Sequence, residues 1–385
     1  MNRRPTVALL VESSNAYARG VLEGIMTYVR RHRAWTIYLP EQERGAAPPQ
    51  WLADWPGDGI IARIENEAIA EVVRRSRLPT VDVSAARRLD DIPWVETDDV
   101  AIAQLAADHF TERGFRNLAF CGVAGFNWSQ WREQAFAKCA RQAGCSYSHY
   151  ESTSRYAVDY SWSRERQRLA EWVGGLPRPL GIMACYDIQA RELLDVCREL
   201  DIAIPEEIAL IGVDNDRLLC SLATPPLSSV IPDAQRAGYE SAKLLDRMMA
   251  GEPVEGRAHL IEPLGIESRQ SSDALAIDDV DVARALRFIR EHACDAIQVG
   301  DVLKHVDISR RVLENRFGKL LGRTPHAEIL RVRIGRVREL LRDRDLTLLD
   351  IADRTGFEHV EYLSTVFRRE TGETPTQFRS RIENQ

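Results

Sequence analysis

The sequence lacks the paired cysteines that a disulfide framework or a zinc site would need. Its seven cysteines are an odd number, and no two of them stand at the Cys-x-x-Cys spacing of many zinc sites. We therefore expect single buried thiols and no metal. Long apolar runs are also missing, because no stretch approaches the roughly 20 residues of a membrane-spanning helix. No secretory leader follows Arg3 and Arg4, so we expect a cytoplasmic protein.

Motifs of nucleotide-binding proteins and hydrolases are absent as well. The chain contains no GxGxxG or GxxxxGK[ST] phosphate loop, no GxSxG nucleophile turn and no HExxH zinc motif. Nothing else in the sequence marks a nucleophile. We therefore expect no catalytic residue and no cofactor, which argues against an enzyme.

Charge is distributed unevenly along the 385 residues, a length that predicts two or three domains. Residues 281–385 hold 20 Lys and Arg against 17 Asp and Glu, whereas the rest of the chain holds 31 against 41. A mildly basic tail on an acidic body places any polyanionic partner at the tail. A solvated helical face would have a similar composition, so charge alone does not identify DNA as that partner.

Short apolar runs alternate with amphipathic segments over the first 265 residues. The runs predict strands at 6–12, 35–39, 58–64, 79–84, 117–123, 181–187 and 208–216. The segments predict helices at about 17–29, 65–75, 100–112, 129–143, 162–174, 188–200 and 234–250. This α/β alternation predicts parallel sheets wound on both faces. Two sheets fit the length, with chain crossings near 100–115 and 225–235.

Polar residues that follow these strands are the candidates for a ligand site, because open parallel sheets bind ligands at the C-terminal ends of their strands. The candidates are Glu12, Ser13, Asn15, Tyr17, Phe126, Asn127, Trp128, Trp131, Arg132, Asp187, Asp214, Asn215 and Asp216. Carboxylates accept hydrogen bonds from vicinal hydroxyls and Arg donates in a planar fork, while indole rings suit the apolar face of a sugar. These types favour a sugar site. The alternatives are a helix N-cap for Asp187, an exposed ion pair for Arg132, and core positions for Trp128 and Trp131.

The same region resembles the periplasmic-binding-protein-like effector domain of the LacI/GalR repressors. The segments that carry the resemblance are VALLVESSNAYARGVLEGI, WREQAF, ACYDIQARELLDVCRELDIAIPEEIALIGVDND and PPLSSVIPD. The resemblance implies a two-lobed sugar-binding domain in which Asp187, Asp214 and Arg132 contact the effector. Ala135 departs from the usual glycine of that family. We expect no DNA-binding headpiece of the LacI kind before the first strand.

The tail is predicted to be helical and to contain an internal repeat. Residues 267–281 are rich in Ser and Asp and have no periodicity, which predicts a linker between an effector domain at 1–266 and a second domain at 282–385. The residues Leu313, Phe317, Gly322, Thr324 and Pro325 recur fifty positions later as Leu363, Phe367, Gly372, Thr374 and Pro375. Each repeat predicts a short helix, a tight turn and a second helix.

The second helix of each repeat has two different faces. The apolar faces hold Leu313, Phe317 and Leu320 in the first repeat, and Leu363, Val366 and Phe367 in the second. The opposite faces hold Arg310, Arg311, Glu314 and Asn315, and His359, Glu361, Tyr362 and Thr365. Such side chains can reach base edges in a major groove. The alternative is a helical bundle that binds another protein.

A long helix at 327–342 is predicted to join the two repeats. Its inward positions are Leu330, Ile334, Val337 and Leu341, and its outward positions are Arg331, Arg333, Arg336, Arg338 and Arg342. Of these arginines, we name Arg338 as a candidate DNA contact, to phosphate rather than to bases.

The segment DIADRTGFEHVEYLSTVFRRETGETPTQFR resembles the DNA-binding signature of the AraC/XylS family. The segment ISRRVLENRFGKLLGRTP resembles the other helix-turn-helix of that family. Departures are Leu363 for the usual Phe and Phe378 for the usual Tyr. A LacI-like effector domain followed by an AraC-type domain is similar to the architecture of the xylose-responsive regulators of this family.

This order of domains implies a sugar-responsive transcription regulator, an activator of genes for xylose or another pentose. Its implied partners are a sugar effector, D-xylose first, double-stranded DNA, RNA polymerase and a second copy of the chain in a homodimer. Two alternatives stay open: a regulator for a different sugar, and a cytoplasmic enzyme of sugar metabolism that uses Asp187 and Asp214 as an acid–base pair.

Overall fold

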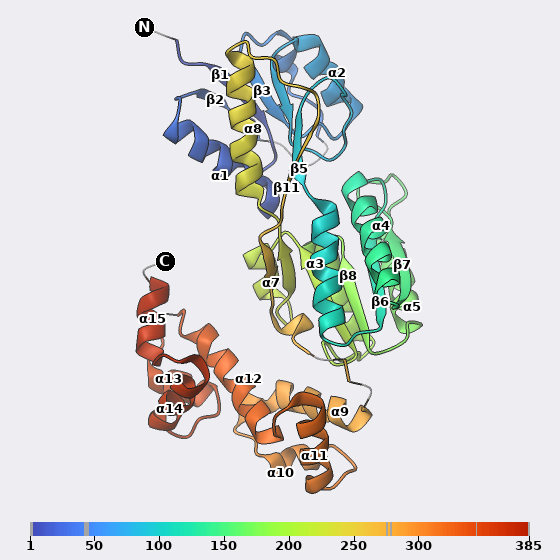
Figure 1. Cartoon of the computed structure of the whole chain (residues 1–385), viewed down its shortest axis with the longest axis vertical. Helices are drawn as coiled ribbons and strands as arrows, with labels where there is room; N and C mark the ends of the chain where they lie inside the picture. The colour runs from blue at the N-terminus through green and yellow to red at the C-terminus, as the bar shows by residue number, and fades with distance from the viewer. Residues whose placement is uncertain (1–2, 42–45, 275, 278, 344, 384–385) are drawn as a thin grey trace. The chain divides into compact units, whose positions relative to one another are not determined.

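The computed structural model describes residues 3–41, 46–274, 276–277, 279–343 and 345–383. The chain divides into two compact units, Met1–Ala274 and Leu275–Gln385. The first unit contains two sheets with helices packed on them, and the second is helical (Figure 1). Among the described residues, no helix is both long enough and apolar enough to cross a bilayer.

The first sheet of the α/β unit has six strands in the order β11-β5-β4-β3-β1-β2, all paired in parallel. Its strands are β1 (Thr6–Leu10), β2 (Thr36–Tyr38), β3 (Gly59–Ala62), β4 (Thr80–Asp82), β5 (Trp94–Thr97) and β11 (Ala258–Ile261). Helices α1 (Ala16–Arg31) and α8 (Ala234–Met249) pack on one face. Helix α2 (Glu67–Ser76) and the 3-10 helix η1 (Gln50–Asp54) pack on the other. Burial on both faces explains why β1 and β3 are continuous apolar runs.

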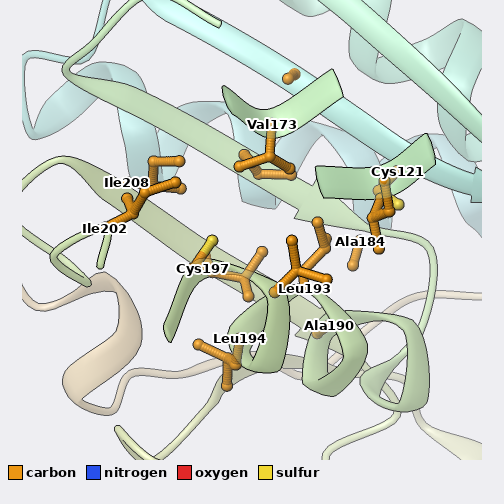
Figure 2. Packing of buried hydrophobic residues seen from close by; sticks show 14 of the residues in the cluster. Cys121, Val173, Ala184, Ala190, Leu193, Leu194, Cys197, Ile202 and Ile208 are labelled. Atoms are coloured by element: carbon orange, nitrogen blue, oxygen red, sulfur yellow. The ribbon is translucent and has the colours of Figure 1, made fainter. Parts of the chain in front are cut away.

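The second sheet has the order β12-β10-β9-β8-β6-β7, and only its β10–β12 pair is antiparallel within the described residues. Its strands are β6 (Asn117–Val123), β7 (Ser146–Ser152), β8 (Leu180–Ala184), β9 (Ile208–Val213), β10 (Ser228–Ile231) and β12 (Gly265–Glu267). Its helices are α3 (Asp99–Glu112), α4 (Asn127–Gln142), α5 (Trp162–Gly174), α6 (Asp187–Glu199), α7 (Arg217–Leu222) and the 3-10 helix η2 (Gln270–Ser272). Figure 2 shows Ala190, Leu193 and Cys197 of α6 packed among residues of the sheet and α5.

The chain passes between the two sheets three times. It leaves the first sheet after β5, returns to it as α8 after β10, and crosses again between β11 and β12. The first two crossings lie close to the predicted places. The third was not predicted, because β11 and β12 are short and half-exposed and carry no clear alternation.

The segment before the second unit is packed rather than free. Ser271 Oγ donates to the Leu210 carbonyl at 2.6 Å and accepts from the Ser228 amide at 2.8 Å, and Ser272 Oγ donates to Ser228 Oγ at 2.8 Å. Residues 267–272 of the predicted linker therefore lie on the second sheet, and the division between units follows Ala274. Serine-rich composition resembles a linker, but these serines are buried hydrogen-bonding groups.

The helical unit confirms the predicted repeat. Helix α9 (Val280–His292) and the 3-10 helix η3 (Ala293–Asp295) precede it. The first repeat comprises α10 (Val299–Leu303) and α11 (Arg310–Leu321), and the second comprises α13 (Leu348–Arg354) and α14 (Val360–Thr371). Helices α12 (Pro325–Leu340) and α15 (Pro375–Glu383) follow the respective repeats. Gly322 and Gly372 end α11 and α14 with φ of 67° and 81°, a left-handed cap that favours glycine.

Two expectations for this unit are wrong. Arg333 is only 8% exposed, and its guanidinium donates to the carbonyls of Ala293 at 2.7 Å and Ile297 at 2.9 Å. It points inward because these carbonyls offer hydrogen bonds that solvent would otherwise supply. Leu320 is 36% exposed, and its neighbour Leu321 packs against the core instead.

Helices α1 and α8 approach each other closely at two glycines. A Cβ on Gly24 would lie 2.0 Å from the Gln235 carbonyl oxygen, and one on Gly238 would lie 1.9 Å from the Val21 carbonyl oxygen. We predict that Gly24→Ala lowers the free energy of unfolding of the first unit by roughly 1–3 kcal/mol, because overpacking pushes the helices apart. Urea denaturation followed by circular dichroism measures this change.

Gly174→Ala is the matched control, because a Cβ at this last residue of α5 would meet no atom within 4 Å. It should be neutral or stabilising by up to about 1 kcal/mol. Equal stability of Gly24→Ala and the wild type would show that the helices do not depend on this close approach.

Candidate functional site

A cavity opens in the first unit where strands of both sheets end. Its empty space, including the mouth, is about 1370 Å³. Much of the lining comes from residues that follow the strands: Ser14, Asn15, Ala16 and Tyr17 after β1, Arg63 after β3, Phe126, Trp128 and Arg132 after β6, Asp187 after β8, and Asp214 and Asp216 after β9. The position agrees with the rule that parallel sheets bind ligands at these ends.

Most of the predicted ligand residues lie in this cavity. Asn15, Tyr17, Trp128, Arg132, Asp187 and Asp214 all line it. Glu12, Ser13 and Trp131 are not among the lining residues. Glu12 is buried and accepts a hydrogen bond from Asn15 Nδ2 at 2.8 Å, while the Ser13 carbonyl accepts one from Arg19 at 3.1 Å.

Asp187 is a buried acceptor rather than a helix cap. It is the first residue of α6, and the N-cap position belongs to Tyr186. Its carboxylate accepts hydrogen bonds from Ser229 Oγ at 2.6 Å, the Asp216 amide at 2.8 Å and Cys220 Sγ at 3.4 Å. Burial, reinforced by the negative charge of Asp214, raises the pKa of Asp187 to about 8. Its charge state therefore changes near neutral pH.

Arg132 is buried in a fixed orientation. Its Nε donates to Asp99 Oδ1 at 2.7 Å and its Nη1 donates to the Cys185 carbonyl at 2.6 Å. The guanidinium also lies over the Trp128 ring, 5.1 Å from its centroid. Burial raises the pKa of Asp99, and the positive charge of Arg132 opposes that shift. This pairing holds the arginine fork rigidly at the wall of the cavity.

Sequence reasoning missed Arg63, which enters the cavity from the first sheet. It donates from Nη1 to Glu12 at 2.6 Å and from Nη2 to Glu65 at 2.7 Å, and it lies 5.8 Å from the Tyr17 ring centroid. Burial raises the pKa of Tyr17, so its hydroxyl stays neutral. The signal for Arg63 was visible, because a charged residue directly follows the apolar strand β3.

Three neighbouring aromatic rings line the cavity on the side of the second sheet, those of Phe126, Trp128 and Tyr186. The sequence predicted Phe126 and Trp128 but not Tyr186. The ring centroids of Phe126 and Trp128 are 5.3 Å apart, and those of Trp128 and Tyr186 are 5.7 Å apart. Trp131 lies elsewhere and packs against Arg87, whose guanidinium is 4.3 Å from its ring centroid. The three rings therefore offer the cavity one indole, that of Trp128.

A second missed group begins at the last residue of β7. Ser152, Thr153, Ser154, Arg155, Tyr156 and Tyr160 line the cavity, together with Gln189 and Glu192 of α6. Strand β7 itself escaped prediction because SYSHYES contains no apolar run.

The predicted DNA contacts lie on the solvent side of the second helices. Arg310, Arg311 and Asn315 on α11 are exposed, and the half-exposed Glu314 accepts from Arg310 Nε at 2.9 Å. On the second repeat, His359 holds the N-cap position of α14, and Glu361, Tyr362 and Thr365 are exposed. The exposed Arg338 lies over the Phe378 ring at 5.6 Å. Leu313, Phe317, Leu363, Val366 and Phe367 are buried. Each second helix thus keeps a polar face toward solvent.

Three family models match successive parts of the chain. Residues 6–100 match a XylR N-terminal domain, and residues 107–272 match a periplasmic binding protein-like domain. Residues 302–381 match a helix-turn-helix domain.

Proteins similar over the full length carry the same combination. The chain is 32% identical over 381 residues to a xylose operon regulatory protein of Haemophilus influenzae, a match that covers 97% of both chains. It is 32% identical over 388 residues to the protein of the same name from Escherichia coli, covering 98% of this chain and 97% of that one. The solved structure of the xylose-binding transcription activator xylR matches with a TM-score of 0.84 and 32% identity over 98% of each chain.

The raised pKa of Asp187 predicts a pH dependence of stability without ligand. The folded-state value of about 8 exceeds the value of about 3.9 for an unfolded chain, so the folded state holds a proton that the unfolded state releases. The resulting stability is complete below pH 4 and is lost as the pH rises through 8. We predict that the free energy of unfolding falls by roughly 1–3 kcal/mol more in wild type than in Asp187→Asn between pH 6 and pH 9.

Urea denaturation of both proteins at several pH values measures this difference. Burial also raises the pKa of Asp82 to about 7, but Asp82 is present in both proteins and cancels in the comparison. Parallel pH profiles of the two proteins would contradict the assignment to Asp187.

Proposed function

The chain belongs to the family of xylose operon regulatory proteins, and we propose that D-xylose is its effector. It is a sugar-responsive DNA-binding regulator of transcription and not an enzyme, in keeping with relatives that match it from end to end. The observation that carries the proposal for xylose is this full-length similarity to xylose regulators, combined with a cavity that contains acids, arginines and an indole.

The residues of the cavity have complementary roles in this proposal. Asp214 and Asp187 accept hydrogen bonds from ring hydroxyls, and Arg132 and Arg63 donate to ring or hydroxyl oxygens. Trp128 covers the apolar face of the ring. Asn15 and Tyr17 contribute from the first sheet, whereas Glu12 acts indirectly by orienting Arg63, its partner at 2.6 Å. Ser13 has no direct role, because it does not line the cavity.

DNA binding is proposed to use both repeats. Helices α11 and α14 each enter a major groove, where Arg311, Asn315, Glu361 and Thr365 face the bases. The faces of α11 and α14 that meet the DNA also include Arg310, Glu314, His359 and Tyr362. Arg338, on the joining helix α12, neutralises a phosphate.

Sugar and DNA binding are proposed to be coupled through closure of the cavity. A ligand shifts the regulator only as far as it binds one state better than the other, and such couplings are typically about 1–3 kcal/mol. The regulator acts in the cytoplasm as an activator that contacts RNA polymerase. A homodimer places two DNA-binding units on one site and gains affinity from their effective concentration.

Calorimetry with D-xylose, arabinose, ribose and glucose tests the effector. Xylose should bind most tightly, because the relatives that match this chain from end to end are xylose regulators. Tighter binding of another sugar would refute the proposal that D-xylose is the effector, and the assignment as a regulator would stand.

Two neighbouring tryptophans provide a matched test of the cavity. We predict that Trp128→Ala weakens xylose binding about tenfold, because the sugar loses its apolar cover. Trp131→Ala should change the affinity less than about twofold, because Trp131 packs on Arg87 outside the cavity. Titration calorimetry measures both, and equal losses in the two variants would contradict the stacking role of Trp128.

DNA recognition is tested with a fragment that the wild-type protein selects from a random pool. We predict that Arg311→Ala or Glu361→Ala reduces discrimination against random DNA by about 1–3 kcal/mol per lost base contact. Arg338→Ala should weaken binding to all DNA sequences alike, because Arg338 contacts phosphate. It should also reduce the number of ions released on DNA binding by about one.

Fluorescence anisotropy titrations at several salt concentrations measure these effects. The control Arg287→Ala removes an arginine of α9 that pairs with Glu291, and it should leave DNA binding unchanged. Sequence preference that survives in both Arg311→Ala and Glu361→Ala would show that the two helices do not read bases.

A further inference from the structure

The cavity of the first unit extends beyond the residues proposed to hold xylose. Its lining continues from the residues that follow β8 and β9 to residues that follow β7. Among the lining residues that the xylose proposal does not use, one group follows β7 and continues on α6. Its members are Thr153, Ser154, Arg155, Tyr156 and Tyr160 after β7, and Glu192 of α6.

Helix α6 carries one residue of the proposed xylose site and one residue of this further group. Asp187 and Glu192 both line the cavity and are five residues apart on the same helix. At 1.5 Å per residue they are separated by about 7.5 Å along the axis. Asp187 and Glu192 therefore line the cavity at different points along α6.

The chemistry of the further group matches that of a sugar site. Arg155 Nη2 donates to Glu192 Oε1 at 2.9 Å, which fixes a donor and an acceptor side by side. Thr153, Ser154 and Tyr160 add hydroxyls that both donate and accept. Tyr156 is 60% exposed and offers a flat ring at the cavity. An aromatic face beside paired polar groups can cover the apolar face of a pyranose while binding its hydroxyls.

We propose that these residues form a second subsite, which takes a second sugar ring, so that a disaccharide of xylose also serves as an effector. The proposal rests on the proposed function, because it requires the first ring to occupy the xylose site. Tyr156 covers the second ring, and Arg155 and Glu192 bind its hydroxyls. The regulator would then respond to the short oligosaccharide as well as to the free pentose.

Titration calorimetry on the full chain with D-xylose and β-1,4-linked xylobiose tests the second subsite. We expect wild type to bind xylobiose at least as tightly as xylose. Tyr156→Ala should lower the affinity for xylobiose about tenfold and change the affinity for xylose less than about twofold, because only the second ring loses a contact. The control Trp162→Ala removes another aromatic side chain that is 60% exposed but lies outside the lining, and it should affect neither sugar.

The possible failures are distinguishable. Wild type that binds xylose but not xylobiose, or xylobiose binding that is equal in wild type and Tyr156→Ala, would overturn the second subsite and leave the proposed function intact. Absence of xylose binding would refute the proposed effector, and the second subsite would fall with it. Because Tyr156 is largely exposed, its variant should melt like wild type, which thermal unfolding verifies.

Discussion

The cavity proposed to bind sugar depends on one buried carboxyl group, that of Asp187. Its three donors come from the start of β10, the turn after β9 and helix α7, so one side chain aligns segments that are far apart in the sequence. The donors offset the cost of removing the carboxyl group from water. Gly212 on β9 is part of the same constraint, because a Cβ there would lie 2.3 Å from Asp187 Oδ1.

Hydrogen bonds continue from this carboxylate to the exit of the first unit. Ser229 Oγ, which donates to Asp187, accepts from the Asn215 amide at 2.9 Å, and Asn215 Oδ1 accepts from Arg269 Nη2 at 2.7 Å. The backbone of Arg269 is held at both its amide and its carbonyl by Ser228 Oγ. The segment that leads into the DNA-binding unit is therefore anchored three hydrogen-bonded residues away from the proposed sugar contact.

Periodicity and strand-end rules predicted the α/β architecture, the helical repeat and Arg132, Asp187 and Asp214 at one cavity. They failed where a residue's environment depends on distant backbone. Strand β7 is polar because it lies at the edge of its sheet, so it lacks the apolar run by which buried strands are found. Arg333 is buried because carbonyls of Ala293 and Ile297 accept from it, and no local pattern reveals such acceptors.

The segment from Ala293 to Ile297, whose carbonyls bind Arg333, also connects the two repeats. The turn of the second repeat contains Gly356, with φ of 71°, and a Cβ there would lie 2.8 Å from the Ala296 amide nitrogen and 2.9 Å from the Cys294 carbonyl oxygen. Glycine thus lets this turn pack against the chain that enters the first repeat, while Arg333 of the joining helix bonds to the same stretch. Two repeats joined in this way resist independent movement. In the proposed coupling between sugar and DNA binding, we therefore expect the spacing of α11 and α14 to stay constant.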